Sequence, residues 1–329
     1  MLDQQVLRIS LSRLATLGHE LKLKAGRLRV SAVNQGVASP VVVIRRPRGT
    51  ARAPLFLIHP VGGSVIAYYE LASHMHPEQP IYAIENQVAF RSGLALYSTI
   101  EEMAEGYLRE VRAIYPKGPL IFGGYSMGGA VAFEMAWQAR RRGEQVSIVS
   151  IIDTPARLRD LGDPPEETID SSELALIVRM MASRLGREIT LPAEELEPLP
   201  PDQRLEHVVG VLKRERLLAS QADAPLLRQL LKVVRNNELA QRRYVPNPYD
   251  GDVLLFRASD PSPELMAEAP DVYDDPTFGW QAACLKPVRV ERLRGEHMRM
   301  LNPPYVQMLA AALQQHLDIR KPGGVIAPF

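Results

Sequence analysis

The residues best suited to chemistry lie in one short segment, Phe122-Gly-Gly-Tyr-Ser-Met-Gly-Gly129. It sets Ser126 in a G-x-S-x-G pattern between Gly124 and Gly128. A serine in this pattern lies on a sharp turn from a strand into a helix, which strains its backbone and exposes its hydroxyl. Glycines flank it because a Cβ at either position would collide with neighbouring chain. We therefore predict that Ser126 is a nucleophile.

The segments on either side of this turn fit that geometry. An apolar run at residues 120–122 precedes the turn, as a buried strand would. Residues 130–139 keep apolar side chains at helical spacing, and three arginines and Gly143 follow, which suit a helix C-terminus. The sequence thus predicts a strand, a turn and a helix around Ser126.

A serine hydroxyl needs a base to accept its proton and an acid to orient that base. Among the seven histidines, His297 alone follows the last predicted strand, in a loop before the final helix. We predict that it is the base. His59 ends a strand near the site, but it belongs to a loop that we expect to be structural. The remaining histidines lie in helical patterns, near a helix end or in the N-terminal arm: His19, His74, His76, His207 and His316.

Two aspartates follow strand-like runs and are candidates for the acid, Asp153 and Asp260. Either one keeps the chain order serine, acid, histidine, which excludes the chymotrypsin-like and subtilisin-like arrangements. Asp260 occupies the usual acid position of an α/β-hydrolase, but its context Ser-Asp-Pro-Ser-Pro is equally a turn signal. The residues alone leave the choice open.

The tetrahedral intermediate of such a reaction needs backbone N–H donors. One donor comes from the residue after the nucleophile, which is Met127. The second is expected from the loop at residues 59–64, where Pro60 has no N–H and Val61 is the first residue that can donate. Two glycines follow and let the chain turn away. We predict an oxyanion hole formed by Val61 and Met127.

Composition limits the other functions. The 329 residues carry a net charge of +1, which gives no sign of a nucleic-acid partner. The sequence contains neither an apolar run long enough to span a membrane nor the pattern of a signal peptide. We therefore expect a cytoplasmic protein without membrane attachment. Cys284 is the single cysteine, which excludes an internal disulfide. We expect it to be a buried thiol, and we expect neither a bound metal nor a cofactor.

Apolar runs alternate with helical patterns over most of the chain, which predicts an α/β fold. With the turn at Ser126, the pattern is that of an α/β-hydrolase with a mostly parallel, doubly wound sheet. A basic N-terminal arm, residues 1–36, precedes this domain at residues 37–329. Arg45-Arg-Pro-Arg48 reads as a linker. The predicted strands lie at residues 53–60, 80–84, 120–122, 146–152, 253–256 and 288–293.

The alternation stops between about residues 160 and 243. Three amphipathic helical stretches occupy this interval, at residues 172–185, 202–218 and 225–244. Ligands of α/β sheets bind beyond the carboxyl ends of the strands, so a helical insertion that leaves there would roof the site. We call this predicted insertion the lid.

Taken together, the chain resembles a thioesterase domain of the polyketide synthase and nonribosomal peptide synthetase family. The resemblance runs from about Val41 to Leu317, and its most specific segments are residues 57–63, 123–129, 151–155 and 295–298. The family places its acid directly after the strand that follows the helix of the nucleophile, which points to Asp153 over Asp260. Its helical lid matches the insertion.

The resemblance implies that an acyl chain is released from the phosphopantetheine arm of an acyl or peptidyl carrier protein. Ser126 would form an acyl-enzyme, and water or an internal nucleophile would then give a free acid or a macrocycle. Such products include polyketides, nonribosomal peptides and antibiotics. An editing (type II) thioesterase and a carboxylesterase for small esters stay open as alternatives within the fold. A noncatalytic docking module is the alternative from another class.

The N-terminal arm contains a helix pattern followed by a hairpin pattern around Ala25 and Gly26. In this it resembles docking domains at the N-termini of some nonribosomal peptide synthetase subunits. The resemblance implies an upstream synthase subunit as partner, and a plain extension is the alternative. A homodimer formed through the arm or the lid also stays open.

Overall fold

The computed structural model of the chain describes residues 39–46, 52–87, 95–160, 162, 169–183, 187–218 and 222–319. The predicted N-terminal arm, residues 1–36, lies outside the described residues. Two compact units divide the rest. The sheet unit comprises residues 40–167, 182–189 and the chain from residue 229 onwards, and the helical unit comprises residues 168–181 and 190–228.

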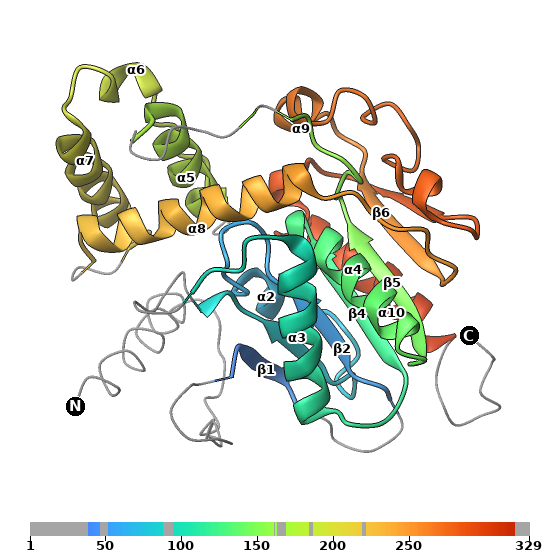
Figure 1. Ribbon diagram of the computed structural model, residues 1–329. Helices are drawn as coiled ribbons and strands as arrows, with labels where there is room; N and C mark the ends of the chain where they lie inside the picture. Colours follow the sequence, from blue (N-terminus) through green and yellow to red (C-terminus); the bar gives the residue numbers. More distant parts are fainter. Residues whose placement is uncertain are drawn as a thin grey trace. The chain divides into compact units, whose positions relative to one another are not determined.

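A seven-stranded sheet forms the centre of the sheet unit, in the order β1-β3-β2-β4-β5-β6-β7 (Figure 1). β1 pairs with β3 in antiparallel orientation and every other pair is parallel. This confirms the predicted mostly parallel sheet. The strands are β1 (Val41–Arg45), β2 (Leu55–Ile58), β3 (Ile81–Ile84), β4 (Leu120–Tyr125), β5 (Val146–Ile152), β6 (Val253–Ala258) and β7 (Arg289–Leu293).

β1 is the strand that the sequence patterns missed. It lies at the sheet edge and is half-buried along its length, although its sequence, VVVIR, contains four consecutive apolar residues. Its last residue, Arg45, falls in the predicted linker. In the structure the Arg45 guanidinium donates to the carbonyls of Met75 and His76, which ties the edge strand to the chain after α2.

Helices cover both faces of the sheet. α3 (Ile100–Ile114) and α4 (Met127–Arg141) pack on one face, in an apolar cluster that includes Phe56 and Phe122. α2 (Ala67–Ser73) and α10 (Tyr305–Asp318) pack on the other, in a cluster with Leu57 and Ile121. Neighbouring residues of one strand thus point to opposite faces, as the pleat requires. These helices bury both faces of the sheet. The ends of its strands, where the candidate site residues lie, are therefore held in fixed positions.

Helices fill the interval between β5 and β6, where the described residues contain no strand. They are α5 (Ser171–Ser183), α6 (Ala193–Leu196), α7 (Pro201–Arg214) and α8 (Ala224–Arg243). Three of them match the predicted stretches, and the single-turn α6 was not predicted. Residues 229–243 of α8 group with the sheet unit. The last part of the predicted lid therefore belongs to the sheet unit.

The described residues of the sheet unit also form three shorter helices: α9 (Pro263–Glu268), η2 (Trp280–Ala283) and η3 (His297–Arg299). In the described part of the chain, no helix has the length and apolar character needed to cross a membrane. Within the same residues, no group of three or more histidine, cysteine or acidic side chains is arranged to hold a metal ion.

Candidate active site

Ser126 lies between β4 and α4 in a strained backbone conformation, with φ 55° and ψ −137°. Its N–H donates to the carbonyl of Ile152 at the end of β5, over 3.0 Å. Its carbonyl accepts from the N–H of Gly129, over 2.8 Å, and from the hydroxyl of Thr154, over 2.5 Å. The neighbouring strand and the following helix therefore hold the strained turn from both sides.

The two glycines of the pattern are required by close backbone contacts. A Cβ on Gly124 would lie 2.0 Å from the carbonyl oxygen of Gly128. A Cβ on Gly128 would lie 2.3 Å from the carbonyl oxygen of Ile58. Both distances are far shorter than a van der Waals contact, so the turn that presents Ser126 can form only without these side chains.

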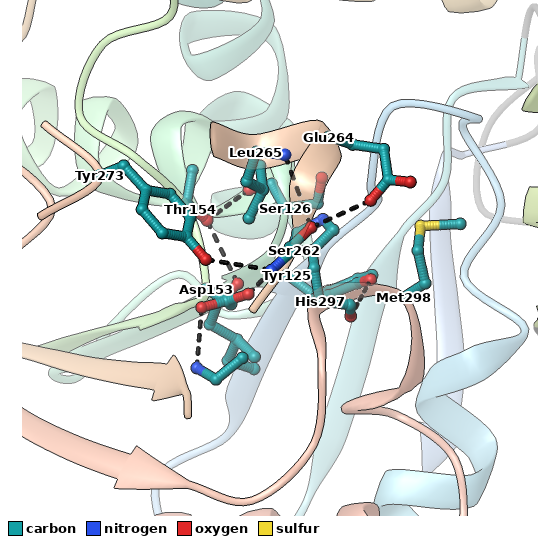
Figure 2. Close-up of polar contacts among 12 residues, drawn as sticks. Tyr125, Ser126, Asp153, Thr154, Ser262, Glu264, Leu265, Tyr273, His297 and Met298 are labelled. Atoms are coloured by element: carbon teal, nitrogen blue, oxygen red, sulfur yellow. Dashed lines mark hydrogen bonds and ion pairs between the residues drawn. The ribbon is translucent and has the colours of Figure 1, made fainter. Parts of the chain in front are cut away.

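His297 begins η3 and its ring contacts two residues of the site. Its Nδ1 lies 2.9 Å from Oδ2 of Asp153, the residue that follows β5 (Figure 2). Its imidazole stacks on the ring of Tyr125 with 4.9 Å between the ring centroids, and the Tyr125 hydroxyl donates to the His297 carbonyl over 2.6 Å. Tyr125 directly precedes Ser126. The stacking thus places the imidazole beside the turn.

The surroundings of Asp153 determine which nitrogen of His297 carries a proton. Asp153 is 1% exposed, and its Oδ1 accepts from the N–H of Ala258 over 2.8 Å. A carboxylate oxygen can only accept, so the bond to Oδ2 requires a proton on Nδ1 of His297. A neutral imidazole then has its lone pair on Nε2. That is the tautomer which can take a proton from a hydroxyl.

Asp260 lies at the end of the adjacent strand and has different partners. It is exposed, its Oδ2 accepts from the N–H of Gly295 over 3.2 Å, and its N–H donates to the carbonyl of Gly295 over 3.1 Å. Ser259 donates its hydroxyl to the other carboxylate oxygen. The structure therefore brings Asp153 to His297 and uses Asp260 to hold the loop that carries His297.

The predicted oxyanion loop follows β2 and is held by its own backbone and by His59. The carbonyl of Pro60 accepts from the N–H of Gly63 over 2.8 Å and from Nδ1 of His59 over 2.9 Å. A trans peptide directs its N–H opposite to its C=O, so the N–H of Val61 points away from both donors. Met127, the other predicted donor, is the first residue of α4.

His59 is fully buried and serves this loop as a neutral ring. Its Nε2 lies 2.7 Å from the hydroxyl of Tyr107, which donates because Nδ1 of His59 already donates to the Pro60 carbonyl. Burial lowers the pKa of His59 to about 4. With its proton on Nδ1, His59 thus bridges the Pro60 carbonyl of the loop and the Tyr107 hydroxyl of α3, as expected of a structural residue.

The model of the family described as "Thioesterase domain" matches residues 53–315, which is most of the chain. The chain belongs to the thioesterase domain family. It is accordingly an enzyme of the serine hydrolase type with the α/β-hydrolase fold, as the sequence predicted.

Relatives of this thioesterase domain are large synthetases. Chondramide synthase cmdD of Chondromyces crocatus is 30% identical over 284 residues, which cover 85% of this chain and 7% of the synthase. Malpinin synthetase of Mortierella alpina is 30% identical over 236 residues, which cover 71% of this chain and 3% of the synthetase. The chain thus spans only a small part of the length of these curated relatives.

Solved structures agree with this family. The four-domain nonribosomal peptide synthetase holo-AB3403, bound to AMP and glycine, matches with a TM-score of 0.73 and 30% identity over 84% of this chain and 20% of its own. The Vlm2 thioesterase domain matches with a TM-score of 0.59 and 22% identity, covering 84% of this chain and 97% of its own. The second likeness establishes the fold alone.

Several residues of the site were not predicted from the sequence. Thr154 directly follows Asp153, and Tyr125 directly precedes Ser126. Their position next to a candidate residue was the signal that could have identified them. Tyr68 donates its hydroxyl to the carbonyl of Ile58 and accepts from the N–H of Tyr125, which links β2 to the turn. Tyr68 lies in a helix remote in sequence from the turn, and no local pattern marks it.

Proposed function

We propose that this thioesterase domain releases an acyl chain from a carrier protein through an acyl-enzyme on Ser126. The observation that carries the proposal is the bond between Asp153 and Nδ1 of His297, formed beside the turn that presents Ser126. This bond leaves Nε2 of His297 as the nitrogen that can accept a proton, on an imidazole stacked beside the strained turn of Ser126. These are the groups that acyl transfer requires.

In the first half of the reaction, Nε2 of His297 takes the Ser126 proton as Oγ attacks the thioester carbonyl. Negative charge develops on the carbonyl oxygen, and the N–H groups of Val61 and Met127 stabilise it. The tetrahedral intermediate collapses, the C–S bond breaks, and the thiol leaves with the proton that His297 returns. Asp153 stabilises the imidazolium throughout and keeps its orientation.

In the second half, His297 takes a proton from water or from a hydroxyl or amine of the acyl chain. The oxygen or nitrogen attacks the acyl-enzyme, and Ser126 leaves with the proton. Water gives a free acid, whereas an internal nucleophile gives a macrocycle. Neither route needs a cofactor of the enzyme's own.

The relatives favour a chain-terminating enzyme over an editing one. Both synthetases compared above are many times longer than this chain, so the matched region is one domain of a multidomain assembly. A domain in that setting meets its substrate on the phosphopantetheine arm of a carrier protein. We propose such a carrier as the partner, and an upstream subunit as a second partner of the arm at residues 1–36.

A labelling and turnover experiment tests the proposal. A fluorophosphonate probe should label the wild-type enzyme and not Ser126→Ala, and labelling of the variant would show that another residue is the nucleophile. Acyl N-acetylcysteamine thioesters mimic the end of the phosphopantetheine arm and should be hydrolysed faster than the matching ethyl esters. A preference for the esters would favour the carboxylesterase alternative.

The same thioesters separate the remaining alternatives. A linear substrate with an internal hydroxyl or amine gives either the free acid or a product lighter by one water, which mass spectrometry distinguishes. Carrier proteins loaded with acetyl groups or with a full-length chain distinguish editing from termination. Preferential clearance of the acetyl group would favour the editing enzyme.

A further inference from the structure

One buried side chain of α8 contacts the loop that carries the proposed donor Val61. Nδ2 of Asn237 donates to the carbonyl of Val61 over 2.7 Å, and Asn237 is 0% exposed. Both residues belong to the sheet unit. The bond therefore ties helix to loop within one compact body, across 176 residues of sequence.

The peptide group before the Val61 Cα sets the direction of the Val61 N–H, and the placement of this N–H in the site also depends on where the rest of the loop lies. The preceding peptide is held from within the loop, because the Pro60 carbonyl accepts from Gly63 and His59. The following peptide carries the carbonyl that Asn237 binds. Asn237 thus restrains, from α8, the peptide group on the other side of Val61. Without this bond the loop at Val61 could shift and carry the N–H out of position.

The amide of Asn237 has a second, unsatisfied half. Its Oδ1 is buried and has no hydrogen-bond partner among the residues that the structure describes. An unpaired buried oxygen opposes folding, and an apolar side chain of similar size would not carry this penalty. A buried amide that binds a loop of the site with one half, while its other half has no partner among the described residues, is a candidate for a functional role.

We propose that Asn237 is a positioning residue, which holds Val61 so that its N–H faces the oxygen on which negative charge develops. The proposal rests on the proposed function, because it takes Ser126 as the nucleophile and Val61 as a donor. Oxyanion donors act through preorganisation, so a donor that can shift out of position loses most of its effect.

The neighbouring residue provides a matched control. Nδ2 of Asn236 donates to the carbonyl of Tyr97 over the same 2.7 Å, on the same helix, but Tyr97 precedes α3 and is not part of the oxyanion loop. Asn236→Leu and Asn237→Leu therefore each remove one bond between α8 and the backbone of the sheet unit. Only the second removes a bond to the proposed oxyanion loop.

The experiment measures kcat and KM for a soluble acyl thioester and the rate of fluorophosphonate labelling. Deletion of an oxyanion donor lowers kcat by about 10²–10³-fold, so displacement of one in Asn237→Leu should lower kcat and the labelling rate by about 10- to 100-fold. KM should stay within about threefold, because the lost interaction forms only in the transition state. Asn236→Leu should stay within about threefold of the wild type on all three measures.

Equal losses in the two variants would overturn the proposal, because they would assign Asn237 to anchoring α8 alone. Wild-type rates in Asn237→Leu would overturn it as well. If the leucine variants unfold at markedly lower urea, Asn237→Ala and Asn236→Ala replace them with the same expected contrast. Labelling of Ser126→Ala would reject the proposed function itself. Labelling confined to Ser126, with no effect of Asn237, would reject only the positioning role.

Discussion

Replacing Asp153 by asparagine is the most direct test of how the base is oriented. The introduced amide would keep an oxygen for the N–H of Ala258, which lies 2.8 Å from Oδ1 of the aspartate. Its NH₂ would then face Nδ1 of His297, where a carboxylate oxygen lies 2.9 Å away in the wild type. An NH₂ group donates, so Nδ1 would have to accept and the proton would move to Nε2. The imidazole would then be unable to take the Ser126 proton.

We expect kcat of Asp153→Asn to fall by about 10⁴-fold, the size of effect that the wrong tautomer causes in a serine hydrolase. This corresponds to a barrier higher by about 5 kcal/mol. Hydrolysis of a soluble acyl thioester measures the loss, and urea unfolding checks that the variant remains folded. Substrate binding should change little, since Asp153 is almost fully buried beneath His297.

The matched control is the same substitution at Asp260, which holds the Gly295 loop from an exposed position. Asp260→Asn keeps one oxygen for that loop and should lower kcat by no more than about tenfold, because it moves His297 without changing its tautomer. A larger loss from Asp260→Asn than from Asp153→Asn would refute the reasoning and transfer the orienting role to Asp260.

Three further outcomes are expected. Thr154→Val removes the hydroxyl that donates to the Ser126 carbonyl over 2.5 Å, so it should lower the free energy of unfolding by about 1–2 kcal/mol. Thr154→Ser keeps a hydroxyl and should have the wild-type stability. Equal urea midpoints in all three proteins would contradict this. Burial lowers the pKa of His59 from 6.5 to about 4. As pH falls, His59 is therefore protonated in the unfolded chain before it is protonated in the folded one. The free energy of unfolding should fall by about 3 kcal/mol between pH 6.5 and 4. Urea unfolding at several pH values should show a smaller loss in His59→Asn. Burial raises the pKa of the Cys284 thiol to about 12, so iodoacetamide at pH about 8 should alkylate it only after unfolding, and rapid alkylation of the native enzyme would disprove its burial.

Features that depend on short stretches of chain were predictable from the sequence. The turn at Ser126 needs glycines within a few residues on each side, and the structure shows the backbone contacts that exclude a Cβ at Gly124 and Gly128. The central strands are buried on both faces, so continuous apolar runs marked them. The position of His297 after the last strand follows from the chain order of the fold. β1 was missed although its sequence, VVVIR, contains four consecutive apolar residues, because the basic residues that follow were interpreted as a linker.

The tertiary structure decided which distant side chains meet. Asp153 and Asp260 both follow strands whose carboxyl ends lie on the same side of the sheet. The sequence alone did not decide which of them is the acid. The choice depends on side-chain direction, since Asp153 points to Nδ1 of His297 while Asp260 binds Gly295. Asn237 likewise reaches Val61 only because residues 229–243 of α8 pack within the sheet unit. The sequence by itself determined the strand, the turn and the position of the proposed nucleophile, because local sterics define such a turn. Packing of separate elements sets the partners of His297 and of the oxyanion loop, and no local pattern encodes that packing.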